Sequence, residues 1–498
     1  MRDRIEKLID KTISVSLPWI VSRDGVVQFV DPLDKKEISA HYGASHMAVS
    51  LIIYGSLKHE ESPVKQGEDL LFSVLDRWNE NKELPDFHND FNNFALCVLD
   101  HFTDKYHERI KETVLGTKDT FFDTINWLPM RWFVNLTRYK WTGDVSYKDI
   151  CQKCMQTISQ ATYSDGFIED MLPLGRSFSL QYDVATVAFM QYLRVMGEDI
   201  DLSVQTGALL NAVYPDGDIN YFGRGTNQIF AWGLWIYLLA SSGQNELDRA
   251  LGYIEKRLPE MLENNNIMLN DYPGEEKFMW WDYHYSSVYT AHLLFWLIMA
   301  LKDFDKCSIE PRLISDGSSG VCISRNDNAF VVTFDGRTEY LAEAGPSVVA
   351  LWTKQSGPVI KGEFGPWYGL FGNKYAQPDV VMKNYMGLIK TESEQSNRRR
   401  NRVFTKLFGE NKKCVAGMNR PVFIAPSVDI SEKVRLTYHV NGMPLLLNVP
   451  SFGGNITVSA DGEQVIMSDT MKIRNQYDWL TIKQKLIDSA NVIEVEVL

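Results

Sequence analysis

Residues 165–193, DGFIEDMLPLGRSFSLQYDVATVAFMQYL, contain two kinds of side chain that could carry out chemistry. Asp165 and Glu169 are carboxylates in a predicted loop, and a pair of carboxylates is what glycoside hydrolysis requires. Arg176 and Tyr182 follow near the start of an apolar helix. A guanidinium beside a phenol favours its ionised form and suits proton abstraction next to a substrate carboxylate. The stretch therefore leaves two different reactions open.

Helices must position these groups, because the chain up to about residue 305 has helical periodicity throughout. Segments 228–243 and 285–304 are apolar nearly all round, which predicts helices buried on every side. Segments 146–163 and 246–263 repeat apolar residues at i, i+3, i+4 and i+7, which predicts amphipathic helices. We expect the first kind to form an inner layer and the second kind to cover it.

Beyond residue 305 the pattern changes to short β-branched runs separated by NG, DG and GG turns. Such turns between apolar runs are hairpin signals, so the pattern predicts an antiparallel β-sandwich of about twelve or more strands. The fold class is thus α+β and multidomain. We expect an α/α domain at 1–305 and a β-sandwich domain at 306–498.

An internal repeat organises the helical half. Asp-Gly pairs stand at 165–166 and 216–217, 51 residues apart, and each precedes an arginine and an apolar helix. Four units of about 50 residues predict helical hairpins wound around an axis, which is an incomplete barrel, or α/α toroid. The loops that enter the inner helices would share one rim. The residues expected to face a cleft there are Asn126, Arg176, Tyr182, Arg224, Asn227, Tyr283 and His284.

Two segments carry a resemblance to a known family. The pattern DG…E…GRSFSLQYD, with an arginine before a helix-borne tyrosine, resembles polysaccharide lyases of the alginate lyase and heparinase II/III type. The segment INWLPMRWFVNLTRYKWTGD, which opens near an asparagine and closes at a GD turn, is similar to the same families. The resemblance covers about residues 120–295 in motif and most of the chain in expected architecture.

The resemblance implies β-elimination at a uronic acid, with a tyrosine as base or acid and amide, guanidinium or imidazole donors on the sugar carboxylate. By this resemblance the catalytic residues are Tyr182, Asn126, Arg176, His284 and Tyr283. The substrate-binding residues are expected to be Arg224, Asn227, Tyr221, Trp127, Arg131 and Trp281. Many family members have a histidine directly after the asparagine, where this chain has Trp127 and Leu128. His284 is expected to replace it, with His88 and His439 as weaker candidates.

Composition limits the partners. The 498 residues carry a net charge of −13, which argues against nucleic acid and anionic membranes, and no long apolar run predicts a membrane span. Without a secretory signal the chain is expected in the cytoplasm. Cys151 and Cys154 form a lone CxxC without nearby histidines, so neither a metal nor a cofactor is expected. The basic segment 397–402 is read as a solvated loop. The expected partner is an acidic polysaccharide or oligosaccharide.

Other functions remain open at this stage. Carboxylates in the loops could support a glycoside hydrolase, and the candidates are Asp165, Glu169, Asp170, Asp183, Asp216, Asp218 and Asp282. A uronate C5-epimerase would use the same proton abstraction and reprotonate from the opposite face. A non-catalytic carbohydrate-binding or assembly protein is the third alternative, because the family histidine is missing.

Overall fold

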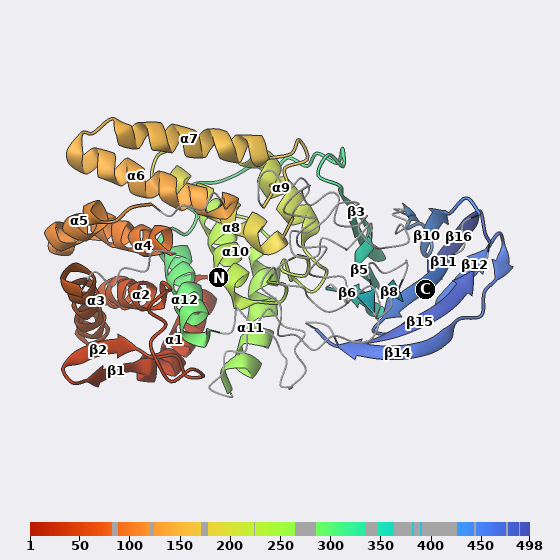
Figure 1. Cartoon of the computed structure of the whole chain (residues 1–498), viewed down its shortest axis with the longest axis horizontal. Coiled ribbons are helices and arrows are strands. Elements are labelled where there is room, and N and C mark those ends of the chain that lie inside the picture. Colours follow the sequence, from red (N-terminus) through yellow and green to blue (C-terminus); the bar gives the residue numbers. More distant parts are fainter. Residues whose placement is uncertain are drawn as a thin grey trace.

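The computed structural model places helices at one end of the molecule and antiparallel sheets at the other (Figure 1). It describes residues 1–81, 88–119, 124–170, 178–223, 225–263, 285–334, 347–362, 381–382, 389–390, 426–442, 445–474, 477–487 and 489–498. The last described helix of the first half ends at Lys302, and the first strand of the second half begins at Val321.

Six helices form an inner ring. They are α2 (Gly43–Lys58), α4 (Asn89–Phe102), α6 (Leu128–Thr142), α8 (Leu180–Val195), α10 (Ile229–Ser242) and α12 (Ser286–Lys302). Each of them contacts the next one in this order, and α12 contacts α2, so the ring is closed. Helices α10 and α12 are buried almost along their whole length, as their all-round apolar sequences predict.

A second layer of helices covers the ring. It consists of α1 (Arg2–Ser16), α3 (Glu61–Asn81), α5 (His107–Gly116), α7 (Ser146–Ala161), α9 (Ser203–Ala212) and α11 (Leu247–Glu263). Helix α1 packs on α12, so the first helix of the chain completes the last pair. Arg4 of α1 also forms ion pairs with Asp248 and Glu255 of α11.

The expectation of four units in an incomplete barrel is therefore wrong, since the described helices form six pairs in a closed ring. The repeat is recognisable by its Asp-Gly turns, but the segment that precedes α4 has no such turn, and the Asp24-Gly25 turn before α2 belongs to a β-hairpin. Helix α2 is apolar on nearly every side and buried along most of its length, and it could have been recognised by that signal.

Close helix contacts explain two glycines of the ring. A Cβ atom at Gly43 would lie 3.0 Å from the Cα atom of Val288 on α12. A Cβ atom at Gly233 on α10 would lie 3.0 Å from the carbonyl oxygen of Leu293. Both glycines let α12 approach its two neighbours more closely than a side chain would permit.

The 51-residue repeat is confirmed in the geometry of its two Asp-Gly turns. Gly166 and Gly217 have φ angles of 93° and 99°, a region that favours glycine. The glycine N–H donates to the carbonyl oxygen of Tyr163 in the first turn and of Tyr214 in the second. A Cβ atom at either glycine would lie within 2.6 Å of a backbone oxygen in the outer helix that follows. Each turn thus fixes where the next unit begins.

Three described sheets make up most of the second half. Their strands are β3 (Val321–Arg325), β4 (Ala329–Phe334), β5 (Ser347–Thr353), β6 (Gly357–Lys361), β9 (Ser427–Asp429), β10 (Val434–His439), β11 (Leu445–Ser451), β12 (Ile456–Ala460), β13 (Glu463–Gln464), β14 (Ser468–Arg474), β15 (Trp479–Ile487) and β16 (Val492–Val497). A further two-stranded sheet consists of β7 (Val381–Met382) and β8 (Ile389–Lys390). The strand orders are β3-β4-β5-β6, β13-β12-β16-β10-β9 and β11-β15-β14, and all pairs are antiparallel.

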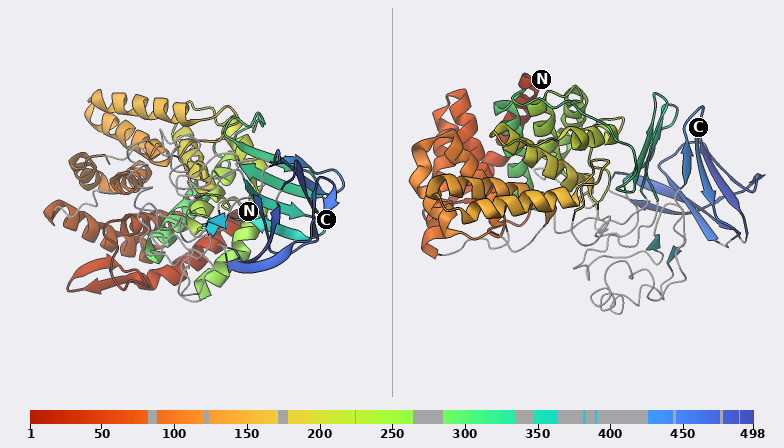
Figure 2. Two further views of the ribbon diagram at one scale, coloured as in Figure 1. Left: turned by 45° about the vertical axis from the view of Figure 1, so that its right-hand side comes forward. Right: turned by 90° about the horizontal axis from the view of Figure 1, so that it is seen from above.

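The sheets share an apolar core, lined by residues such as Leu351, Val359, Leu436 and Val495. Sheet β3–β6 lies between the helices and the other two large sheets (Figure 2). It is therefore the sheet that meets the helical ring.

One hairpin was not predicted. Strands β1 (Ile20–Arg23) and β2 (Val26–Phe29) pair around Asp24-Gly25, both with positive φ, inside a half that was expected to be helical. Across the described ranges, no helix combines the length and the apolar character that crossing a bilayer would take.

Candidate functional site

The starts of the six inner helices meet at one rim of the ring, which we call the N-terminal rim. It comprises residues 41–46, 88–92, 126–131, 178–183, 227–230 and 285–292 of the described chain. Inner helices alternate with outer helices along the chain, so all six inner helices point the same way. Ring contacts between side chains of different helices, described below, confirm that these segments are neighbours.

Aromatic and imidazole side chains crowd this rim. The His41 ring stacks on His88 with centroids 4.1 Å apart, and it lies 4.8 Å from Tyr285. The Tyr42 ring stacks on Phe91 at 4.2 Å and meets the edge of His88 at 5.6 Å. These contacts bring together the loops before α2, α4 and α12, which lie far apart in the sequence.

His88 is held in one orientation. Its Nδ1 lies 2.8 Å from the carbonyl oxygen of Ala40, an acceptor, so Nδ1 carries the proton and Nε2 is the basic nitrogen. Burial, followed by the neighbouring His41, places the pKa of His88 well below its usual value. The imidazole is therefore neutral near pH 7, which is the protonation state that a general base needs.

Two more histidines lie deeper along the ring axis. His46 and His292 have ring centroids 5.3 Å apart, and His292 stacks flat on Phe230 at 4.4 Å. Burial lowers the pKa of His46 to about 3 and places that of His292 well below its usual value. Both side chains are therefore neutral and fully enclosed on the inner side of the rim.

Asn126 and Tyr182, two of the sequence-predicted residues, lie on adjoining elements. Asn126 belongs to the short 3₁₀ turn η3 (Ile125–Trp127), which contacts helix α8, and Tyr182 is in the first turn of α8. The amide of Asn126 is buried, and neither its nitrogen nor its oxygen has a hydrogen-bond partner among the described residues. The Tyr182 side chain is only partly buried. It lies close to Tyr42, whose pKa is raised well above its usual value by burial and, to a smaller extent, by Tyr289 and Tyr182.

The rim also contains Trp127, whose ring lies 5.6 Å from His88 and 5.7 Å from Phe91. Asn227 is buried immediately before α10, with a φ angle of 62°. Backbone of this kind is strained for a residue other than glycine and persists only where surrounding contacts impose it. Trp127 and Asn227 thus reach the rim from two further loops.

Two residues that were predicted to bind substrate have partners within the fold instead. Arg131 forms a buried ion pair with Asp90, at 3.0 Å between Nη2 and Oδ2. Tyr221 is fully buried, donates its hydroxyl to the carbonyl oxygen of Ala212 and lies against Phe330 of β4. Tyr221 therefore contributes to the contact between the ring and the sheets.

Five predicted site residues lie outside the described residues: Arg176, Arg224, Trp281, Tyr283 and His284. Helix α8 begins at Leu180, four positions beyond Arg176 in the sequence. Asp282, one of the carboxylates considered for hydrolysis, is likewise outside the described part of the chain. His439 ends strand β10 in the sheets and is exposed, so it does not belong to the rim.

Most described carboxylates considered for hydrolysis have partners. Both oxygens of Asp165 accept hydrogen bonds, Oδ1 from Phe167 N–H at 3.4 Å and Oδ2 from the N–H and hydroxyl of Ser319 at 3.0 and 2.7 Å. Glu169 accepts the hydroxyl of Tyr163. Asp216 and Asp218 form an ion pair each with Lys361, at 2.7 and 3.0 Å.

Asp183 differs from these carboxylates. It is fully enclosed, and burial raises its pKa well above the usual value, although the N–H of Ile168 opposes this and Asp165 adds to it. Burial therefore favours the protonated form of this carboxyl group. It follows Tyr182 directly in the sequence and faces the 165–168 turn.

Sequence reasoning missed His41, Tyr42, His46, Tyr285 and Tyr289 at the rim and ranked His88 low. The missed residues belong mainly to the first and last units of the ring. A search for polar and aromatic residues just before every all-apolar helix would have found them, since HYGASH precedes such a run at residue 47.

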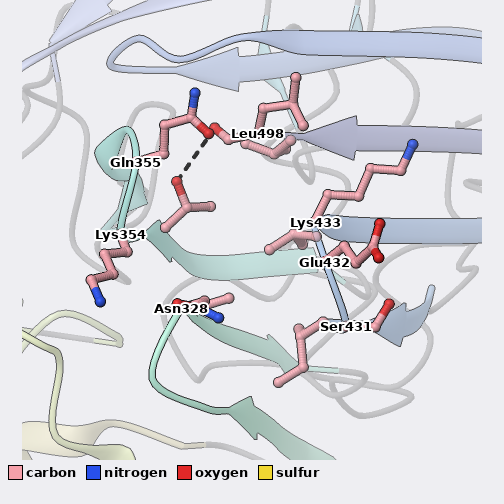
Figure 3. A pocket seen from close by; sticks show the side chains of 12 residues that line it. Asn328, Lys354, Gln355, Ser431, Glu432, Lys433 and Leu498 are labelled. Carbon is pink, nitrogen blue, oxygen red and sulfur yellow. Dashed lines mark hydrogen bonds between the residues drawn. The ribbon is translucent and has the colours of Figure 1, made fainter.

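A separate pocket of about 370 Å³ lies among the sheets, remote from the rim (Figure 3). Asn328, Lys354, Gln355, Ser431 and Glu432, all from strand-connecting turns, are part of its lining, and their side chains are exposed. Within the described ranges, no three His, Cys, Asp or Glu side chains lie together as a metal site requires.

No known protein family matches this sequence, and no curated protein matches it either. Several solved structures resemble it. The GH76A α-1,6-mannanase of a Salegentibacter species is 12% identical, with 60% of this chain and 99% of that chain covered and a TM-score of 0.43. A polysaccharide lyase is 11% identical, with 60% and 97% covered and a TM-score of 0.42.

A variant of the unsaturated glucuronyl hydrolase from Streptococcus agalactiae is 11% identical, with 62% and 93% covered and a TM-score of 0.41. These structures include both hydrolases and a lyase. At identities and scores this low, the likeness carries no argument about which reaction this chain performs.

Proposed function

We propose that this chain is a carbohydrate-active enzyme that cleaves a uronate-containing polysaccharide by β-elimination at the N-terminal rim. The observation that supports this proposal is which polar side chains lie at the rim and which of them already have partners. Groups suited to proton transfer and carboxylate binding, Tyr182, His88 and Asn126, lie at the rim. Of the carboxylates nearby, Asp90 is paired with Arg131, Asp165 accepts hydrogen bonds from Ser319, and burial favours the neutral form of Asp183.

Each group has a role in the elimination. Asn126 presents an amide without another partner among the described residues, and it would donate to the substrate carboxylate and stabilise the enolate-like charge that develops there. His88, neutral and with Nε2 as the basic nitrogen, would take the C5 proton. The C5–H electron pair then forms the C4=C5 double bond while the C4–O bond breaks. Tyr182 would protonate the departing glycosidic oxygen.

Trp127 and Tyr42 suit the sugar ring itself. Aromatic rings offer apolar faces to the C–H bonds of a sugar, and both rings lie beside His88. We keep Arg176, Arg224, Asn227, Trp281, Tyr283 and His284 as proposed members of the site on the strength of the sequence resemblance. The family type, the acidic substrate, the division of the chain at residue 305 and the sandwich arrangement of the sheets are likewise proposals.

Hydrolysis is the second candidate, and Asp183 is the observation in its favour. A carboxyl group kept protonated by burial is what a general acid in a glycosidase requires. It would need an ionised carboxylate partner at the rim. Among the described residues the nearby candidates are Asp165, which already accepts two hydrogen bonds from Ser319, and Asp170, whose backbone carbonyl oxygen accepts the N–H of Ile125.

To test the proposal, the purified protein is incubated with a panel of uronate-containing polysaccharides, and the ultraviolet absorbance of an unsaturated uronide is measured. We expect absorbance to appear, and we expect Tyr182→Phe to reduce the rate by a factor of about 10² or more, the size of a general acid–base contribution. Tyr139→Phe, on the part of α6 far from the rim, is the matched control and should keep the rate.

Other outcomes identify the alternatives. Reducing ends without new absorbance indicate hydrolysis, and Asp183→Asn should then abolish the reaction. Exchange of the C5 hydrogen with solvent without cleavage indicates epimerisation. Binding without either change indicates a carbohydrate-binding protein, and each of these results overturns the lyase proposal.

A further inference from the structure

A buried lysine connects the sheets to the helical ring. Lys361, the last residue of β6, is 4% exposed, and its ammonium forms ion pairs with Asp216 at 2.7 Å and Asp218 at 3.0 Å. Tyrosine rings surround the same ammonium. Its Nζ lies 4.6 Å from the ring centre of Tyr214, 4.9 Å from Tyr253 and 4.6 Å from Tyr477. We call these six residues the lysine cage.

The lysine cage draws on both halves of the chain. Tyr214, Asp216 and Asp218 belong to the second Asp-Gly turn, and Tyr253 belongs to α11. Lys361 and Tyr477 come from the sheet half, Tyr477 from the connection between β14 and β15. A cation within about 6 Å of aromatic faces gains free energy from each, and the gain is greater where water is excluded. The lysine cage thus connects the sheets to the second Asp-Gly turn of the helical ring.

Asp218 remains ionised inside this cage. Burial alone would raise its pKa, but the charge of Lys361 and hydrogen bonds from Tyr477 and the Asn220 N–H outweigh burial and lower it. The pair is therefore a buried carboxylate and a buried ammonium, each of which depends on the other. Removing either partner would leave an uncompensated charge.

Asn220 carries the connection from the cage to the rim. Its N–H donates to Asp218 Oδ1 at 2.8 Å, and its carbonyl oxygen accepts the Tyr477 hydroxyl at 2.8 Å. The same carbonyl oxygen accepts the N–H of Asn227 at 2.7 Å. The side-chain amide of Asn220 donates to the carbonyl oxygens of Gly225 at 2.8 Å and Gln228 at 3.2 Å. One residue thus ties both ends of the rim loop together.

Contacts of this kind are what Asn227 needs. Its left-handed backbone costs free energy that its surroundings must supply, and the bond from its own N–H goes to Asn220. Gly225 also lies against Gln181, the residue before Tyr182, where a Cβ atom would come within 2.2 Å of Nε2. A shift of the loop would therefore disturb both Asn227 and the start of α8.

We propose that Lys361 and Tyr477 of the sheet half are positioning residues, which hold the loop 220–228 so that Asn227 stands at the rim in a substrate-binding position. The sheets would then be part of the binding site although none of their described strands reaches the rim. The statement about substrate rests on the proposed function, whereas the statement about the loop does not.

The chain offers a matched pair of variants. The hydroxyls of Tyr477 and Tyr253 both donate to Asp218 Oδ2, at 2.6 and 3.1 Å, and both rings face Lys361. Only the Tyr477 hydroxyl also reaches Asn220. Tyr477→Phe and Tyr253→Phe therefore weaken the cage in the same way, but only Tyr477→Phe removes the link to the rim loop.

Hydrogen exchange of the peptide covering 219–230 measures the loop without any substrate. We expect exchange to rise about fivefold or more in Tyr477→Phe and in Lys361→Met, and to rise less than about twofold in Tyr253→Phe. Equal exchange in Tyr477→Phe and Tyr253→Phe, or wild-type exchange in Tyr477→Phe, would overturn the positioning role.

Kinetics test the substrate part separately. On a cleaved polysaccharide, Tyr477→Phe should raise KM about tenfold, the worth of roughly one hydrogen bond, with kcat within about twofold, and Tyr253→Phe should leave both near wild type. An unchanged KM despite faster exchange would remove Asn227 from the binding site and keep the loop result. A wild-type chain that acts on no uronate polymer would refute the proposed function, and the exchange data would still decide the positioning.

Discussion

The ion pair of Arg131 and Asp90 gives the sharpest test of the rim's construction. It connects α6 to the first turn of α4, and both side chains are almost fully buried, at 9% and 1% exposed. Two guanidinium nitrogens of Arg131 reach the same carboxylate oxygen, Nη2 at 3.0 Å and Nε at 3.3 Å. Each charge thus has the other as a buried partner.

Removing one partner leaves a buried charge, which costs about 3–5 kcal/mol of unfolding free energy. We expect this cost for Arg131→Met and a similar cost for Asp90→Asn. Independent losses would sum to about 6–10 kcal/mol in the double variant. Because the double variant holds neither member of this buried pair, we expect it to lose no more than either single variant, so the coupling energy is at least about 3 kcal/mol.

Urea unfolding of the four proteins measures this coupling. Arg109→Met is the control, because the pair of Arg109 with Asp76 is largely exposed and should contribute no more than about 1 kcal/mol. If the two single losses add within about 0.5 kcal/mol, or if Arg131→Met costs no more than Arg109→Met, the reasoning about a mutually dependent buried pair is refuted. The KM of the double variant then shows whether Arg131 has a structural or a substrate-binding role. A KM near that of wild type indicates a structural role, and a raised KM indicates that Arg131 binds substrate.

Two further predictions concern carboxylates that hydrolysis would use. Asp165→Ala should cost about 2–4 kcal/mol in urea unfolding, because two hydrogen bonds from Ser319 to a buried carboxylate are lost, while the rate per folded molecule stays unchanged. A lost rate in Asp165→Asn, whose amide oxygen still accepts from Ser319, would make Asp165 catalytic. For Asp183 the folded pKa lies above the unfolded one, so wild-type stability is highest below the unfolded pKa and falls as the pH rises toward the folded pKa. Between pH 4.5 and 6.5, the unfolding free energy of Asp183→Asn relative to wild type should therefore rise by up to about 1.4 kcal/mol per pH unit. A difference that does not change with pH would show that Asp183 is ionised in the folded chain.

Local patterns predicted much of the helical half correctly. Helices α10 and α12 are inner helices because a helix that is apolar on every side is buried on every side. Helix α7 covers α6 and α11 covers α10, each with one apolar face. The Asp-Gly turns were recognisable because glycine is needed where φ is positive. All of these features depend on residues close together in the sequence.

Ring closure lies beyond such patterns. His41 and Tyr285 are neighbours only because α12 returns to α2, a contact between residues 244 positions apart. The path of a loop is equally hidden, as Tyr221 shows. It stands near the second Asp-Gly turn in sequence, yet its hydroxyl turns to Ala212 and its ring to β4, because the sheets cover that side. The lysine cage, which joins residues 214 to 477, depends on the same kind of distant packing.

The geometry of the ring also bears on the charge of the substrate. A net charge of −13 would by itself repel an acidic polymer, but exposed charges are screened over about 8 Å at physiological salt. The field at the rim depends on what lies within that distance. All six inner helices begin there, and each N-terminus carries a partial positive charge of about half a unit that acts on groups near its first turn. Arg131 and Asp90 cancel each other, and the buried histidines are neutral, so the helix ends are a main source of positive potential among the described residues. A rim of this kind favours an anionic ligand over a neutral one, and this is the ground on which we propose an acidic substrate.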